Sequence, residues 1–201
     1  MSAPFELYGT ITSPYVRRVR LVLHELALPC ALVDTSTEAG QARLRALTPL
    51  WKVPIVRTPE GTVIFDSQAI VDHLRRTQPR WPFRAVGDDV DEANLTNVIV
   101  GALDTAINVF YLKKDGADPA ALPYLGKQVA RVDAAMAWVE ERLPLLGGGP
   151  QLAPTLPGVA LFAALEWMAF RSAWPVRSHP ALESWRQAEA GRPGWAETAP
   201  R

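Results

Sequence analysis

The sequence predicts a two-domain protein, with a small α/β domain followed by an all-helical domain. Three observations support this fold class. Short apolar segments bounded by turn residues alternate with helical patterns only in residues 1–78. Residues 78–88, QPRWPFRAVGD, contain two prolines and a glycine, which is typical of a linker. Over residues 88–201 the strand signal disappears and apolar residues recur at helical spacing.

The first domain is expected to start with a strand, a helix, a strand and a helix. The apolar segment Phe5–Tyr8 predicts the first strand. Pro14 stands where a first-turn proline is tolerated, because its missing N–H would have no helical partner, and apolar spacing extends this helix over 14–28. Cys30–Val33 predicts a second strand, and residues 38–47 predict a weaker helix.

A hairpin and a third helix complete the first domain. The expected elements are a strand at 53–56, a turn at Glu60-Gly61, a strand at 62–65 and a helix capped by Asp66-Ser67 that runs to about residue 77. Pro54 lies inside the first of these strands and cannot donate to a sheet ladder. That strand is therefore expected at a sheet edge or in a special turn.

The second domain is expected to be a helical bundle. Its predicted helices cover residues 90–113, an apolar stripe from Leu125 to Leu143, residues 156–171 and residues 180–190. The helix at 156–171 is apolar on nearly all sides, which indicates a buried central helix. Its apolar run Val159–Phe170 is too short to span a bilayer.

Composition excludes several classes of function. Lys plus Arg and Asp plus Glu number 21 each, so the formal net charge is zero, which argues against a nucleic-acid binder and leaves an anionic membrane little to attract. Cys30 is the single cysteine, so no intrachain disulfide can form and a reducing compartment is expected. The N-terminal MSAPFELYG does not resemble a signal peptide. We therefore expect a cytoplasmic protein.

The segment TITSPYVRRVR, residues 10–20, places hydroxyls at Thr10, Thr12 and Ser13 before a helix. One hydroxyl is sufficient for an N-cap. A helix N-terminus also favours an anion, because its free N–H groups carry about half a positive charge. The extra hydroxyls therefore suggest an anion site, although Ser13 as a plain cap remains an alternative.

The chain resembles the glutathione transferase superfamily, most closely bacterial members with serine at the active position. The motifs that carry the resemblance are TSPYVRRV from Thr12, PLWKVP from Pro49, DSQAI from Asp66, and the 156–171 helix with Thr155 before it and EWMAFR at its end. The resemblance implies a thioredoxin-like first domain, a helical bundle, glutathione as co-substrate without a metal, and a homodimer.

By this resemblance Ser13 is the catalytic residue that stabilises the glutathione thiolate. A thiol has a pKa of about 8.5, and lowering it by about two units needs about 2.7 kcal/mol. A charge-assisted hydrogen bond supplies about 1.5–3 kcal/mol and the helix end about 0.3–2 kcal/mol more, so no general base is needed. Thr12 and Thr10 are the rival donors. Serine cannot form the mixed disulfides of cysteine members, which favours conjugation to small hydrophobic electrophiles.

The same resemblance assigns the glutathione-binding residues. Pro54 is expected to be a cis-proline that aims the Val53 backbone at the cysteinyl group, with an ordinary trans proline as the alternative. Lys52 would contact the glycine carboxylate or be a surface lysine. The remaining assignments are Thr12 near the sulfur, Ser67 at the γ-glutamyl carboxylate, Asp66 at the γ-glutamyl ammonium of the same or the partner chain, and Gln68 as a weaker candidate.

Other side chains have less specific expected roles. The electrophile site is expected at Tyr15, Asn108 and Tyr111, with Phe110 and Trp167 as further candidates that could equally be core. We expect Cys30 to be a small buried residue, and Arg17, Arg18 and Arg20 to be surface charges or members of ion pairs. His24, His73 and His179 lack ligand spacing, so no metal site is expected.

Two positions depart from the family pattern. Gly158 stands where the capping box before the buried helix usually has Asp, which loses about 0.5–2 kcal/mol and is partly offset by Pro157. Trp51 replaces a common glycine and could narrow the glutathione groove or join a dimer contact. Competing functions are a non-catalytic glutathione-binding scaffold, or a glutathione-dependent isomerase, dehalogenase or peroxidase, which fold alone does not separate.

Overall fold

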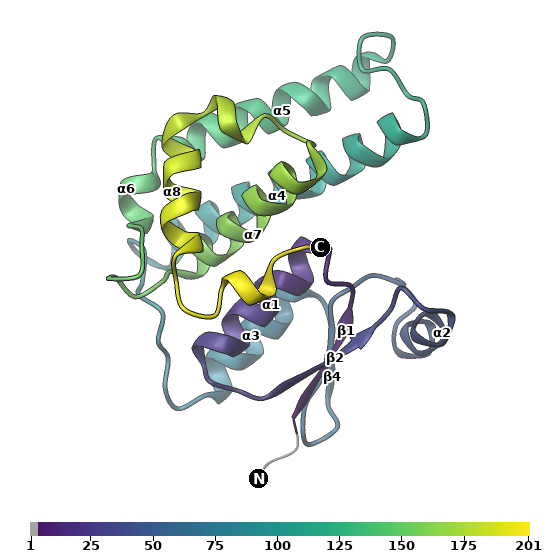
Figure 1. Ribbon diagram of the computed structural model, residues 1–201, viewed down its shortest axis with the longest axis vertical. Coiled ribbons are helices and arrows are strands. Elements are labelled where there is room, and N and C mark those ends of the chain that lie inside the picture. The colour runs from purple at the N-terminus through teal and green to yellow at the C-terminus, as the bar shows by residue number, and fades with distance from the viewer. Residues whose placement is uncertain (1–3) are drawn as a thin grey trace. The chain divides into compact units, whose positions relative to one another are not determined.

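The computed structural model describes residues 4–201, so the first three residues of the N-terminal segment considered above lie outside the described part. The chain forms two compact units (Figure 1). One contains the chain as far as Pro82 together with Gly194–Arg201, and the other contains Phe83–Pro193. The segment 194–201 thus belongs with the first unit, whereas the predicted helical domain of 88–201 included it.

The first unit is built on a mixed sheet. Its strands are β1 (Phe5–Gly9), β2 (Cys30–Asp34), β3 (Ile55–Arg57) and β4 (Val63–Ile64), in the order β2-β1-β3-β4. β1 runs parallel to β2 and antiparallel to β3, and β3 runs antiparallel to β4. The β1–β3 register opposes Tyr8 to Ile55. This is the thioredoxin-like arrangement that the family resemblance implied.

Helices cover the sheet on both sides. These are α1 (Pro14–Glu25), α2 (Glu38–Leu47) and α3 (Ser67–Thr77). α1 and α3 lie side by side on one face, and α2 lies on the opposite side (Figure 1). α1 is shorter than the predicted 14–28, because Ala27 has a left-handed backbone with φ of 54° that cannot continue a helix.

The second unit is helical, as predicted. It contains α4 (Asp89–Lys114), α5 (Pro123–Glu140), α6 (Leu143–Leu146), α7 (Leu156–Arg171), a short 3₁₀ helix (Val176–Ser178) and α8 (Pro180–Ala190). α4 packs against α5 and α7. The apolar stripe expected as one helix is divided between α5 and α6. Pro144 explains the division, because it has no N–H to bond the Glu140 carbonyl and its ring would clash there.

Within residues 4–201, α4 is the one helix whose length and composition would allow it to cross a membrane. Core helices of soluble proteins pass the same test. Leu95, Ile99 and Leu103 of α4 are buried, and the helix packs on two neighbours. We therefore interpret α4 as a core helix of the second unit.

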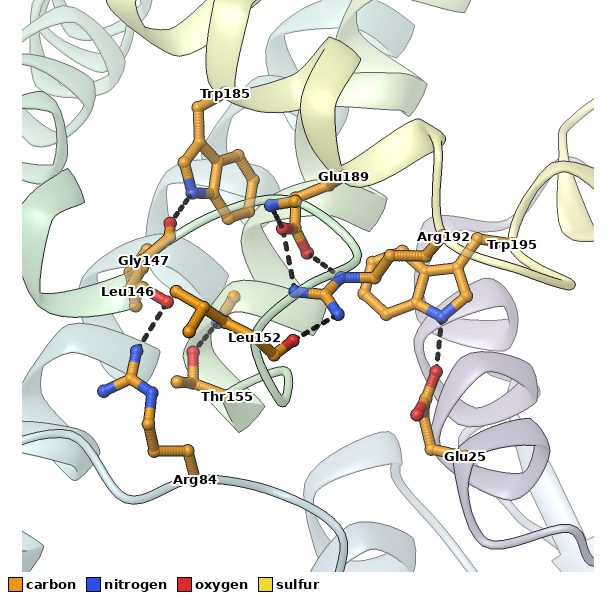
Figure 2. A network of polar contacts seen from close by, with 12 residues as sticks. Glu25, Arg84, Leu146, Gly147, Leu152, Thr155, Trp185, Glu189, Arg192 and Trp195 are labelled. Carbon is orange, nitrogen blue, oxygen red and sulfur yellow. Dashed lines mark hydrogen bonds and ion pairs between the residues drawn. The ribbon is translucent and has the colours of Figure 1, made fainter.

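The loop before α7 is held by α8 and the turn that follows it. The buried Glu189 carboxylate accepts from the Gly149 N–H at 2.6 Å and from Arg192 Nε at 2.6 Å. Arg192 also donates to the Leu152 carbonyl at 2.7 Å, and Trp185 donates to the Gly147 carbonyl (Figure 2). These contacts fix the glycine-rich loop even though Gly158 cannot complete a capping box.

The segment after Gly194 packs on α1. Trp195 is fully buried and donates its indole N–H to Glu25 at 2.7 Å (Figure 2). Arg17 donates to the Thr198 hydroxyl at 3.0 Å, and the half-buried Arg20 donates to the Thr198 carbonyl at 3.3 Å. Of the two expectations for Arg17, a surface charge or a member of an ion pair, the surface charge was wrong, because this segment covers the face of α1 on which Arg17 lies.

Candidate functional site

Three segments of the first unit meet at one end of the sheet. β1 ends at Gly9, just before the hydroxyl-rich turn, and Ile55 at the start of β3 is paired with Tyr8. β4 runs parallel to β1, since both are antiparallel to β3, so its last residue Ile64 leads into the start of α3 at this same end. The topology thus brings the first turn of α1, the Val53-Pro54 turn and the first turn of α3 together.

Ser13 is the N-cap of α1, and Pro14 follows as the first helical residue. Its hydroxyl accepts the Val16 N–H at 3.3 Å, and its own N–H donates to the Thr10 carbonyl at 3.1 Å. A serine hydroxyl has one hydrogen to donate besides its acceptor lone pairs. The cap therefore uses the oxygen as an acceptor and leaves the hydrogen for a ligand, so the capping and ligand-binding interpretations are compatible.

The other two hydroxyls of this turn interact with each other. Thr10 Oγ1 and Thr12 Oγ1 lie 3.3 Å apart, and either can be the donor. One hydroxyl hydrogen of the pair is therefore already engaged. Ser13 carries no such competing donor bond among the contacts of the described chain, which favours it over Thr12 as the donor to an anion.

The Val53–Pro54 peptide is cis, as predicted. Pro54 is buried and precedes β3, so the special-turn alternative is the correct one, and β3 lies between β1 and β4 rather than at an edge. Val53 is half-buried, and within the described chain neither its N–H nor its C=O has a hydrogen-bond partner. A free backbone pair of this kind can receive an extended peptide. Lys52 next to it is exposed.

Trp51 has a backbone conformation that explains why glycine is common at this position in the family that the chain resembles. Its φ is 53°, in the left-handed region that bulky residues rarely adopt. The side chain is 63% exposed, and the Arg45 guanidinium lies 5.7 Å from its ring centroid. The indole is thus presented to solvent directly before Lys52.

The first turn of α3 carries the other predicted ligand contacts. Asp66 is its exposed N-cap and accepts the Gln68 N–H at 2.9 Å. Ser67, the first helical residue, is buried with 4% exposure. The predicted capping role of Asp66 is confirmed, and the helix start that would bind a carboxylate is formed.

Sequence reasoning missed Arg18. It was expected at the surface or in an ion pair, but its side chain is only 2% exposed, and no ion pair to it is formed by residues 4–201. It donates to Gln68 Oε1 at 2.8 Å and to Ser67 Oγ at 3.5 Å. The available signal was its position four residues before the buried Val22, on the inner face of the helix.

The predicted electrophile residues lie in two different units. Tyr15 is half-buried in the first turn of α1. In α4, Asn108 and Tyr111 are exposed, and Phe110 makes edge-to-face contacts with Tyr111 at 5.2 Å and with Trp167 at 5.6 Å. Trp167 is 5% exposed, which favours its alternative interpretation as core. An electrophile site formed by Tyr15, Asn108 and Tyr111 stays a prediction.

Cys30 was expected to be buried, and this was wrong. It is exposed because β2 is the edge strand and has a sheet neighbour on one side only. Partial desolvation of its thiol raises the pKa to about 11, so it is a poor nucleophile at neutral pH. Among the residues from 4 onward, no group of three or more His, Cys, Asp or Glu side chains could hold a metal ion.

Comparison with known proteins gives a consistent picture. Residues 7–82 match the family model described as glutathione S-transferase, N-terminal domain. The uncharacterized GST-like protein YibF of Escherichia coli K12 is 27% identical over 107 residues, which cover 46% of this chain and 53% of that protein. The matched region thus spans about half the length of this curated relative.

Solved structures resemble the chain over nearly its whole length. A glutathione transferase family member from Pseudomonas fluorescens, crystallised with bound glutathione, has a TM-score of 0.82 at 25% identity, with 98% of this chain and 99% of that chain covered. A glutathione S-transferase from Methylobacterium radiotolerans in complex with glutathione sulfonate has a TM-score of 0.81 at 22% identity, covering 98% and 95%. The fold is therefore that of glutathione transferases, and residues 7–82 match the N-terminal domain model of that family.

Proposed function

We propose that this chain is a glutathione transferase that conjugates the glutathione thiolate to small hydrophobic electrophiles. The observation that carries the proposal is the Ser13 hydroxyl, which accepts the cap bond from Val16 and keeps its hydrogen at the end of the sheet where α1 and α3 begin. Support also comes from the bound glutathione in the structurally similar protein of Pseudomonas fluorescens.

The backbone groups of this end of the sheet suit the tripeptide. The unpartnered N–H and C=O of Val53 would pair with the cysteinyl backbone. The first turn of α3 with Ser67 would bind the γ-glutamyl α-carboxylate, and Asp66 would face its ammonium. The exposed Lys52 would contact the glycine carboxylate. This arrangement leaves the cysteinyl sulfur for Ser13, with Thr12 beside it.

In this proposal Ser13 acts by stabilising charge. Its O–H donates to the sulfur and, together with the N-terminal end of α1, lowers the pKa of the bound thiol. The thiolate then attacks the electrophilic carbon, forming a carbon–sulfur bond while the leaving group departs or the added electrons move into the acceptor. The proton of the thiol is lost to solvent before attack, so no side-chain base is required.

The test is the Ser13→Ala variant. We expect the protein to be retained on a glutathione column and to conjugate chlorodinitrobenzene. In the variant kcat/KM should fall about tenfold to 100-fold, because the hydroxyl contributes about 1.5–3 kcal/mol and the N-terminal end of α1 remains. The pKa of bound glutathione, read from the ultraviolet absorbance of its thiolate, should rise by about one to two units.

A matched control is Thr12→Val, which removes a neighbouring hydroxyl that is paired with Thr10. It should change kcat/KM by less than about tenfold. Retention on glutathione with no turnover in the wild type, unchanged by Ser13→Ala, would contradict catalysis and favour a glutathione-binding scaffold.

We further propose that the protein is cytoplasmic and forms a homodimer. The exposed apolar residues of α4 are consistent with an additional partner surface, since Val90, Tyr111 and Leu112 are 64%, 52% and 48% exposed. Light scattering at micromolar concentration should give twice the 22.1 kDa chain mass. A monomer mass would exclude the dimer.

A further inference from the structure

We propose that Arg18 is a positioning residue for the γ-glutamyl carboxylate. It orients Ser67 and Gln68, and it supplies a buried positive charge near the start of α3. The inference rests on the proposed function, because it takes glutathione as the ligand. It assigns a role to a residue of α1 that would act through the first turn of another helix.

The contacts of Arg18 lead directly to the proposed carboxylate site. Its Nη2 donates to Gln68 Oε1 at 2.8 Å, and its Nη1 donates to Ser67 Oγ at 3.5 Å. The amide nitrogen of Gln68 in turn donates to Asp72 Oδ1 at 3.1 Å. The carboxamide of Gln68 is therefore fixed between Arg18 and Asp72, and the guanidinium holds the first turn of α3 against α1.

The direction of the contact with Ser67 matters for ligand binding. A guanidinium can only donate, so the Ser67 oxygen is the acceptor in this contact. The hydrogen of the Ser67 hydroxyl therefore points away from Arg18 and is left to donate elsewhere. An anion at the first turn of α3 is the partner that would use it, together with the free N–H groups of the helix start.

Arg18 is a buried cation without a close counter-ion. It is 2% exposed, its Nε has no hydrogen-bond partner, and no carboxylate in residues 4–201 forms an ion pair with it. A buried charge is costly unless it is paired. A carboxylate bound at the first turn of α3 would supply the missing negative charge. Binding an anion would therefore offset the free-energy penalty of burying the guanidinium.

The charge of this side chain persists at neutral pH. Burial lowers the pKa of Arg18 to about 10, and the more distant Asp72 and Asp66 carboxylates oppose this effect. The guanidinium thus remains protonated under physiological conditions. Its field at the start of α3 is screened little, because it lies in the protein interior.

The test compares two ligands and two variants by calorimetry. One ligand is glutathione, and the other is γ-aminobutyryl-cysteinylglycine, which lacks only the α-carboxylate of the γ-glutamyl group. In Arg18→Met we expect the affinity for glutathione to fall about tenfold to 100-fold, while the affinity for the analogue stays within about twofold. Arg18→Lys keeps the charge without the planar fork and should lie between wild type and Arg18→Met.

Arg17→Met is the matched control, since Arg17 is the adjacent buried arginine and donates to the Thr198 hydroxyl and the Trp195 carbonyl. It should leave the ratio of the two affinities unchanged, even if stability falls. Equal losses for both ligands in Arg18→Met, or full affinity for glutathione in both Arg18 variants, would overturn the inference while the proposed function stands. A wild-type protein that binds neither ligand would overturn both.

Discussion

The starts of α1 and α7 follow the same local design in two different surroundings. Each has a hydroxyl N-cap and a proline in the first turn, and each hydroxyl accepts the N–H three residues on. The bond is 3.3 Å at Ser13 and 3.0 Å at Thr155. Ser13 is half-buried, however, whereas Thr155 is 1% exposed.

The comparison indicates that the surroundings of a capping hydroxyl decide whether it is a candidate ligand-binding group. At α7 the neighbouring space is filled, since a Cβ built at Gly158 would lie 2.8 Å from Thr155 Oγ1 and 3.6 Å from Trp185. At α1 the hydroxyl lies at the sheet end that also presents unpartnered backbone groups at Val53. The same bond therefore has a purely structural role in one helix and a proposed chemical role in the other.

The largest expected effect concerns the contacts that enclose the start of α7. Glu189→Ala should lower the free energy of unfolding by about 3–5 kcal/mol, because it removes the buried carboxylate that accepts two hydrogen bonds from the buried Arg192. The Gly149 N–H would lose its acceptor as well. Urea denaturation followed by circular dichroism measures this loss.

A matched control is Glu141→Ala, which removes a 75% exposed carboxylate paired with Arg142 at 3.3 Å. It should cost about 0–1 kcal/mol, as exposed ion pairs do. Equal losses in the two variants would mean that the buried pair does not hold the loop before α7.

Much of the fold could be predicted from local signals. The helices at Glu38–Leu47, Leu156–Arg171 and Pro180–Ala190 have the predicted bounds, because proline and hydroxyl or glycine signals mark their ends. Other boundaries were shifted by backbone conformations that the pattern does not encode. The left-handed Ala27 shortened α1, and Pro144 divided the long apolar stripe.

The site was less predictable where burial depends on long-range packing. The cis Pro54 and the cap at Asp66 follow from short motifs. The burial of Arg17 and Arg18 does not, because it is created by residues 194–201 and by α3, which are distant in the sequence. The prediction that Cys30 is buried was wrong because β2 is an apolar strand at the sheet edge and keeps an exposed face.

Removing the two capping hydroxyls, at Ser13 and Thr155, should lower stability by different, intermediate amounts. Thr155→Ala should lower stability by about 1–2 kcal/mol, at the upper end for an N-cap, because the Gly158 N–H would remain buried without an acceptor. Ser13→Ala should cost about 0.5–1 kcal/mol, because water can replace a half-exposed cap. Denaturation of both variants gives the stabilities, and glutathione affinity should be unchanged in Thr155→Ala. A larger stability loss at Ser13 than at Thr155 would contradict the comparison.

The smallest expected effect is a pH dependence of the folding stability that arises from Glu183 and Arg186 of α8. Bidentate hydrogen bonds of 2.8 Å from Arg186 lower the pKa of Glu183 from 4.5 to about 2. A lowered folded-state pKa stabilises the protein above the unfolded pKa, and this stabilisation is lost as pH falls through the folded value. Glu183→Gln should therefore cost about 1 kcal/mol above pH 5. The difference from wild type should shrink between pH 4.5 and about 2.

Urea denaturation of wild type and Glu183→Gln at several pH values measures this difference. Gln187→Ala is a useful control, because Gln187 also donates to Glu183, at 2.7 Å, but does not itself titrate. Its effect on stability should depend on pH much less than that of Glu183→Gln. A Glu183→Gln difference that stays constant down to pH 2 would show that the Arg186 contact does not lower the pKa of this carboxylate.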